Sequence, residues 1–170
     1  KSTTHLFSKI FVPVCLMILL VLPYQSTAQA YGQKGMVVSS SVLASQAGVD
    51  ILKKGGNAID ASIATAFVLA VTHPQAGNIG GGGFIVFMKA SGDATTIDFR
   101  EKAPLAATAN MFLNSAGQLI ENSNHDSIKA IGVPGTVAGL YMAHKKYGKL
   151  PWRDLVQPAI DLAKNGFEMS

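Results

Sequence analysis

The sequence has 170 residues, of which 48% are apolar and 14% are charged, and its formal net charge is +4. This length suits one modest domain. The basic residues do not gather into a patch, so the composition argues against a nucleic-acid partner. Cys15 is the single cysteine, which excludes a disulfide within the chain.

The first thirty residues have the features of a secretory signal peptide. A basic start precedes the apolar run Ile10–Leu22, and Ala28-Gln29-Ala30 is a small-x-small cleavage signal. A membrane anchor is the alternative, but the apolar run is too short to span a bilayer comfortably. We therefore expect residues 1–30 to be a signal peptide that is cut before Tyr31.

Removal of this segment would take away Lys1, Lys9 and Cys15. Residues 31–170 would then carry 12 basic and 10 acidic side chains, a net charge of +2. Cys15 lacks the small-residue surroundings of a lipid-attachment site. Because a cysteine-free exported protein fits a bacterial periplasm or the cell exterior, we expect one of these locations.

A short strand and two helices are predicted at the start of the mature part. Gly35–Ser39 has strand character, and Val42–Lys54 has the period of an amphipathic helix that ends at Gly55-Gly56. Asn57 or Asp60 can cap the next helix. The first helix is expected to bury its small-residue face, which consists of Ala44, Ala47, Gly48 and Ile51.

The second helix, Ala58–Val71, is apolar on nearly every face, which is typical of a buried core helix. Pro74 ends it, because the residue before a proline, here His73, is pushed out of the helical region. This helix should therefore form the centre of the core.

The next segment predicts a β-hairpin. Phe84–Met88 is an apolar run of strand length, Ser91-Gly92-Asp93 has the composition of a turn, and Thr95–Arg100 alternates between two faces. Two strands around one short turn form a hairpin. Folding the chain about this turn places Arg100 opposite roughly Gly81–Gly83.

Arg100 is the candidate substrate-binding residue. Its planar guanidinium matches a carboxylate, and bare glycine amides beside it would let a ligand approach the main chain. The hairpin would then seat a small anionic substrate. The alternative is a surface arginine paired with Asp98 or Glu101; composition does not separate the two, and the hairpin geometry favours the site.

The glycine run Gly80–Gly83 has alternatives of its own. It can simply be a tight turn before a core strand. A Walker phosphate loop needs Lys followed by Ser or Thr after its last glycine, and here Phe84 follows. A dinucleotide loop joins a strand to a helix, whereas this run joins a helix to a strand. The glycine run can therefore be either a structural turn or part of a substrate-binding site.

Beyond the hairpin, residues 103–130 have no clear period. We expect loops there, with short helical turns around Thr108–Phe112, and a polar surface stretch over residues 114–126. No internal repeat is present.

Two helices are predicted in the last part. Thr136–Tyr147 is closed by Gly148, and another helix begins at Pro151 and ends at Gly166. The inward-facing residues of this last helix are expected to be Leu155, Ala159, Leu162 and Ala163.

The remaining polar residues suggest neither a metal site nor a catalytic cluster. The histidines are dispersed without metal-ligand spacing, and His125 and His144 look like surface residues. Asp50 and Asp60 are interpreted as a helix-face residue and a possible cap. Ser39-Ser40-Ser41 lacks a G-x-S-x-G setting.

Several longer motifs together resemble the γ-glutamyltranspeptidase family. They stand in the family's order and span nearly all of residues 35–170. The motifs are Asp50-Ile51-Leu52-Lys53-Lys54-Gly55-Gly56-Asn57-Ala58-Ile59-Asp60-Ala61, Val71-Thr72-His73-Pro74, Gly77-Asn78-Ile79-Gly80-Gly81-Gly82-Gly83-Phe84, Asp98-Phe99-Arg100-Glu101-Lys102-Ala103-Pro104, Pro134-Gly135-Thr136-Val137-Ala138-Gly139 and Gln157-Pro158-Ala159-Ile160.

The resemblance implies an α+β fold, the αββα sandwich of N-terminal-nucleophile hydrolases. Residues 31–170 would be the N-terminal portion of the large subunit, an incomplete domain. The family makes a precursor that cuts itself into a large and a small subunit. The new N-terminal threonine of the small subunit attacks the γ-glutamyl amide of glutathione or a relative, with its own α-amino group as base. The acyl group then passes to water, an amino acid or a peptide, and no cofactor or metal is implied.

The nucleophilic threonine has no counterpart in this chain, so the resemblance implies no catalytic residue here. Thr3-Thr4-His5 resembles the family's cleavage point, but it precedes the large-subunit motifs and is interpreted as coincidence. We therefore expect the chain to be inactive when expressed alone. A truncated, non-catalytic γ-glutamyl-binding module is the alternative.

Arg100 in its Phe-Arg-Glu setting resembles the residue that holds the glutamyl α-carboxylate. The family's relatives include acylases of cephalosporin side chains and enzymes that transfer poly-γ-glutamate. Arg100 favours γ-glutamyl substrates over neutral acyl groups, and Lys102 stands in a slot that the family varies.

Overall fold

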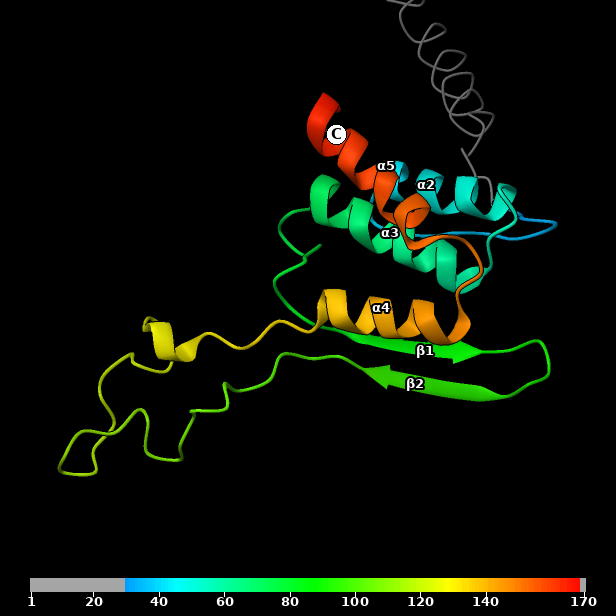
Figure 1. Cartoon of the computed structure of the whole chain (residues 1–170). Helices are drawn as coiled ribbons and strands as arrows, with labels where there is room; N and C mark the ends of the chain where they lie inside the picture. Colours follow the sequence, from blue (N-terminus) through cyan, green and yellow to red (C-terminus); the bar gives the residue numbers. More distant parts are fainter. Residues whose placement is uncertain (1–29, 169–170) are drawn as a thin grey trace, which may run out of the picture. The chain divides into compact units, whose positions relative to one another are not determined.

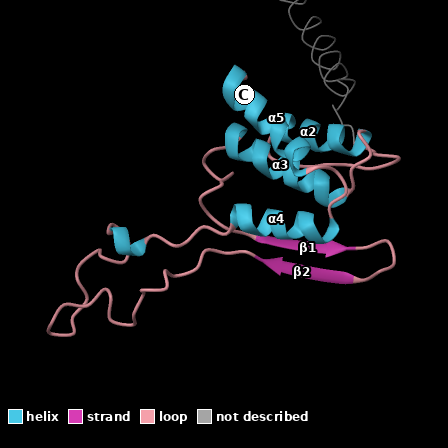
Figure 2. Cartoon of the chain, viewed as in Figure 1, coloured by secondary structure: helices cyan, strands magenta, loops and turns pink. Residues whose placement is uncertain are grey.

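The computed structural model describes residues 30–168, so most of the predicted signal peptide lies outside the described residues. The chain divides into two units, residues 1–33 and 34–170, and the second contains all the elements named here (Figures 1 and 2). In chain order they are α2 (Val42–Lys53), α3 (Ala58–Thr72), β1 (Phe84–Met88), β2 (Ala94–Asp98), the 3₁₀ turn η1 (Ile128–Ala130), α4 (Thr136–Tyr147) and α5 (Trp152–Asn165).

Helix α3 is the centre of the core, as its apolar composition predicts. It packs against α2, α4 and α5, and α4 in turn lies between α3 and the hairpin (Figure 1). The predicted small-residue face of α2 is buried, from Ala44 to Ile51. Gly55, at a φ of 88°, turns the chain after α2, because a glycine adopts this conformation at no steric cost. The helical core therefore follows from local patterns.

The predicted strand Gly35–Ser39 is wrong. In the described part of the chain these residues pair with no strand, although Val37 packs against the core. A strand depends on a neighbour that accepts and donates main-chain hydrogen bonds, and five residues cannot specify that neighbour by themselves.

The buried carboxylate of Asp60 ties the start of α3 to the loop between α4 and α5. It accepts hydrogen bonds from the amides of Asn57 at 3.0 Å, Lys149 at 3.0 Å and Leu150 at 3.3 Å. The Asn57 side chain completes a capping box and donates to the carbonyl of Tyr147 at 2.6 Å. Asn57 and Asp60 both act as caps, and Asp60 has a second, tertiary role that the sequence did not indicate.

The hairpin forms in the predicted register. Phe84 pairs with Asp98 and Met88 with Ala94, and Gly92 turns the chain at a φ of 91°. Ile97 faces the core, whereas alternate residues of β1 point away from it and stay exposed: Phe84, Val86 and Met88. Only the inner face of this two-stranded sheet is therefore covered by described residues.

Residues 103–127 form turns and loops, and the segment runs away from the helices in Figure 1. The turn at Thr108 closes with one hydrogen bond, from Met111 N, and does not extend into a helix. Leu113 and Leu119 form an isolated bridge. Most of 114–126 is exposed, as expected for its polar composition.

The last two helices have the predicted positions with two corrections. Leu155 and Ala159 are buried, but Ala163 is exposed. His144 is half-buried rather than a surface residue. Its Nε2 lies 2.7 Å from the Leu150 carbonyl, and its ring packs against Trp152.

Candidate functional site

The segment that carries Arg100 continues the hairpin beyond β2. The amide of Phe99 donates to the carbonyl of Gly83 at 3.0 Å, and a β-carbon on Gly82 would lie 2.6 Å from the Arg100 Cα. Arg100 therefore lies opposite Gly82, and the predicted placement beside the glycine run is confirmed.

The segment that leads into α4 also forms main-chain hydrogen bonds with this part of the chain. Lys102 and Val133 exchange both of their main-chain hydrogen bonds, at 3.1 and 2.7 Å. The amides of Gly135 and Thr136 both donate to the carbonyl of Gly81, at 2.7 and 3.0 Å. The start of α4 is thereby fastened to the glycine run, and the backbone of Arg100 lies between two anchored neighbours.

The side chain of Asn78 completes this connection. Its Oδ1 accepts hydrogen bonds from the amide of Gly81 at 2.9 Å and from the hydroxyl of Thr136 at 2.6 Å. Thr136 is buried. Sequence reasoning missed both residues; the only available signal was an asparagine just before a turn-like run, where its side chain commonly bonds the backbone a few residues on.

Two of the glycines, Gly82 and Gly135, pack directly against neighbouring main-chain atoms. A β-carbon on Gly82 would lie within 2.7 Å of main-chain atoms of Phe99, Arg100 and Glu101, and one on Gly135 or Gly139 would overlap Phe99. None of Gly80–Gly83 has a positive φ. The run is therefore not a left-handed turn, and its bare main chain at Gly82 admits the neighbouring strand.

The guanidinium of Arg100 projects from this rigid backbone into solvent, with 68% of its side chain exposed. The Nε of Arg100 lies 3.9 Å from Glu101 Oε2. The main-chain amide of Arg100 donates to Asp98 Oδ1 at 3.0 Å. A single exposed ion pair of this length contributes about 0–1 kcal/mol, so Glu101 competes weakly for the guanidinium. An anionic ligand can displace it without a large loss of stability.

Replacing Gly82 with alanine is expected to lower the stability of the complete protein by about 1–3 kcal/mol, because an overpacked contact forces the backbone to shift. Urea unfolding measures this loss. Gly80→Ala is the matched control, since nothing lies within 4 Å of a β-carbon there. It should change stability by about 0.5 kcal/mol or less. Equal losses in the two variants would contradict the backbone-packing account.

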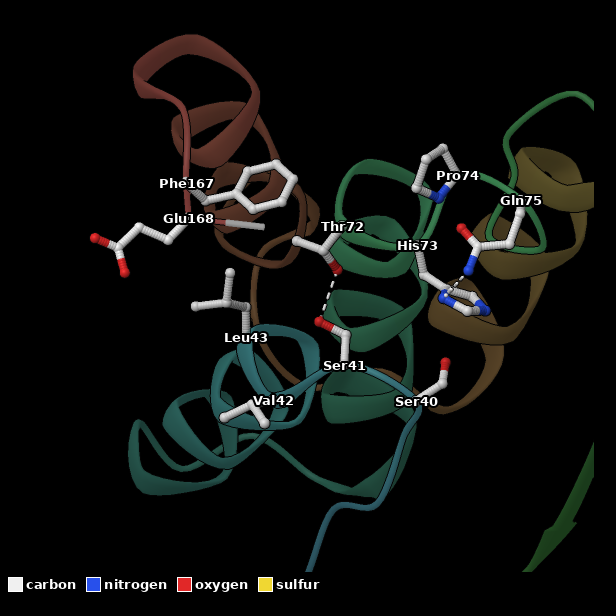
Figure 3. A pocket seen from close by; sticks show the side chains of 10 residues that line it. All are labelled: Ser40, Ser41, Val42, Leu43, Thr72, His73, Pro74, Gln75, Phe167 and Glu168. Atoms are coloured by element: carbon white, nitrogen blue, oxygen red, sulfur yellow. Dashed lines mark hydrogen bonds between the residues drawn. The ribbon is translucent and has the colours of Figure 1, made fainter. Parts of the chain in front are cut away.

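A separate cavity of about 880 Å³ lies between the ends of α2 and α3 and the residues after α5 (Figure 3). The hydroxyl of Thr72 donates to Ser41 Oγ at 2.8 Å, and the side-chain Nε2 of Gln75 lies 2.9 Å from His73 Nδ1. Ser41 is also the N-cap of α2. Ser41, Thr72, His73 and Gln75 in this cavity are thus bonded to one another at helix ends, and Arg100 does not line it.

Neither a metal cluster nor a membrane span is found in the part of the chain that the structure describes. Among residues 30–168, no group of three or more His, Cys, Asp or Glu side chains could hold an ion. No helix in that range is long and apolar enough to cross a bilayer.

Comparison with known proteins gives consistent matches. The family model for γ-glutamyltranspeptidase matches residues 44–170. The glutathione hydrolase proenzyme of Escherichia coli (strain K12) is 53% identical over 135 residues, covering 79% of this chain and 23% of that protein. That of Pseudomonas sp. (strain A14) is 51% identical over 142 residues, covering 84% and 25%. The crystal structure of Helicobacter pylori γ-glutamyltranspeptidase matches with a TM-score of 0.77 at 51% identity, covering 82% of this chain and 40% of that one. The chain thus spans about a quarter of the length of these curated relatives.

Proposed function

Because this chain belongs to the γ-glutamyltranspeptidase family, we propose that the complete protein cleaves γ-glutamyl amide bonds such as that of glutathione. The predicted fold class is confirmed: the chain is a part of the N-terminal-nucleophile hydrolase fold of these relatives. In the proposed reaction, a threonine at the N-terminus of the small subunit attacks the γ-carbonyl and releases the amine. Water, an amino acid or a peptide then takes the γ-glutamyl group from the acyl-enzyme.

The part assigned to this chain is recognition of the substrate. We place the α-carboxylate of the γ-glutamyl group on the guanidinium of Arg100, where two parallel N–H···O bonds are possible. The supporting observation is the position of Arg100: its backbone is anchored between Gly83 and Val133, while its guanidinium is exposed and only weakly paired. A guanidinium held on this hydrogen-bonded backbone favours a negatively charged glutamyl group over a neutral acyl group.

The test is hydrolysis of γ-glutamyl p-nitroanilide by the purified complete protein. Release of p-nitroaniline is expected, and addition of an acceptor dipeptide should yield the γ-glutamyl tripeptide. Replacing the small-subunit threonine with alanine is the control and should abolish release. A processed, folded protein that leaves this substrate intact would contradict the proposal.

We also propose that the protein is exported. Ala28-Gln29-Ala30 follows an apolar run that fits a signal peptide, so the mature N-terminus should be Tyr31. Mass spectrometry of the protein recovered from periplasm or medium gives this terminus directly. A mature product that still begins at Lys1 or contains Cys15 would contradict the signal-peptide interpretation.

A further inference from the structure

We infer that Asn78 and Thr136 are positioning residues, whose side-chain hydrogen bond sets the place of the Arg100 guanidinium and so the preference for an α-carboxylate. This inference rests on the proposed role of Arg100. Neither the Asn78 nor the Thr136 side chain needs to contact the substrate for this positioning role.

The bond between Thr136 and Asn78 joins two segments that are far apart in the sequence. Thr136 Oγ1 donates to Asn78 Oδ1 at 2.6 Å, across 58 residues of sequence. The same oxygen accepts the Gly81 amide at 2.9 Å. One amide oxygen therefore joins the glycine run to the first turn of α4, and the threonine end of the bond is buried.

This junction between the glycine run and α4 lies next to Arg100. Gly82, the residue after Gly81, lies directly against the Arg100 Cα, and Gly135 lies against the Phe99 carbonyl. Both contacts leave no room for a side chain, so a shift of the glycine run or of the α4 start is transmitted to the Arg100 backbone. A misplacement of about 1 Å can cost on the order of a hundredfold in rate in a well-oriented site.

Helix α4 has no side-chain N-cap at this end. Gly135 is its N-cap and provides no side-chain hydrogen bond to the helix. The start of α4 is instead held by its two amides on the Gly81 carbonyl and by the Thr136 hydroxyl on Asn78. Removing that hydroxyl leaves the main-chain bonds and loosens only the side-chain brace.

The test compares two substrates on the complete, processed protein. One is γ-glutamyl p-nitroanilide, and the other is γ-aminobutyryl p-nitroanilide, which is the same molecule without the α-carboxylate. The ratio of their kcat/KM values measures recognition of the carboxylate. General loss of stability or of active protein lowers both values together and leaves the ratio unchanged, so the ratio reports positioning.

Arg100→Ala should lower this ratio by about tenfold or more. Thr136→Val and Asn78→Ala should each lower it by about three- to tenfold, through KM for the γ-glutamyl substrate, with kcat within about twofold of wild type. Thr136→Ser keeps the hydroxyl and should restore the ratio. The double variant should lose no more than Asn78→Ala alone, because Asn78→Ala already removes the bond that Thr136→Val removes.

Thr72→Val is the matched control. Its hydroxyl also joins two elements, donating to Ser41 Oγ at 2.8 Å, but away from the hairpin. It should leave the ratio unchanged. If Thr136→Val fails to yield processed protein, Asn78→Ala, at an exposed position, removes the bond to Thr136 together with that to the Gly81 amide and decides the test.

Two results would overturn the inference, and they are distinguishable. If Arg100→Ala lowers the ratio while Asn78→Ala and Thr136→Val do not, the positioning role is wrong and the proposed function stands. If Arg100→Ala itself leaves the ratio at its wild-type value, the assignment of Arg100 to the α-carboxylate fails, and the positioning role fails with it.

Discussion

Arg100→Ala is expected to lower kcat/KM for γ-glutamyl substrates by roughly ten- to several hundredfold in the complete enzyme. A charge-assisted, bidentate pair contributes about 1.5–3 kcal/mol, and about 1.4 kcal/mol corresponds to a factor of ten. The loss should be larger than the exposure of the side chain alone suggests, because the variant also leaves the substrate carboxylate without a partner. Steady-state kinetics on processed protein measures it.

Arg100→Lys separates charge from geometry. Lysine keeps the positive charge but lacks the planar fork, so it should recover only part of the loss. Both variants should still process into two subunits, since the proposed autocleavage needs the small-subunit threonine and its local backbone and not the Arg100 side chain. Arg153→Ala, at the other arginine of the sequence and on an exposed face of α5, is the control and should have wild-type kinetics.

The competing account treats Arg100 as a surface residue paired with Glu101, and the structure does contain that pair at 3.9 Å. It predicts a stability loss of about 1 kcal/mol or less and nearly unchanged kinetics. A decrease of less than about threefold in kcat/KM would support it and remove the recognition role. The two accounts differ in kinetics, so one set of variants decides between them.

The sequence predicted those features that depend on local patterns. The hairpin register follows from one turn and strict alternation, and it placed Arg100 opposite Gly82. The buried face of α2 follows from helical period, and Asn57 with Asp60 is a recognisable cap at the start of α3. In each case the residues that specify the feature are close together in the chain.

Features that depend on distant partners could not be predicted in this way. Gly35–Ser39 has strand composition but no strand partner in the described part, and His144 is half-buried because Leu150 and Trp152 fold back over it. The bond between Asn78 and Thr136 joins residues that no local period relates. The sequence predicted that the glycine run lies beside Arg100. It did not indicate that Gly82 is needed for close packing, which depends on the main-chain atoms packed against that residue.

Asp60→Ala is expected to cause the largest loss of stability, about 2–4 kcal/mol, because it leaves three main-chain donors without their acceptor. The carboxylate accepts from the amides of Asn57, Lys149 and Leu150 and is itself fully buried. Since a folded domain is stable by only about 5–15 kcal/mol, a large share of the precursor should then fail to reach the processed form. Urea unfolding and the yield of cleaved subunits measure the two consequences.

Asp60→Asn and Asp50→Ala show whether the loss comes from these bonds. Asparagine keeps one acceptor oxygen but turns an N–H₂ group toward the donors, so it should lie between wild type and Asp60→Ala. Asp50 stands on the exposed face of α2, with its carboxylate 3.6 Å from Lys53 Nζ, and its removal should cost about 0.5 kcal/mol or less. If Asp60→Ala unfolds at the same urea concentration as Asp50→Ala, the tie between α3 and the α4–α5 loop contributes little. The core formed by α3 would then rest on apolar packing alone.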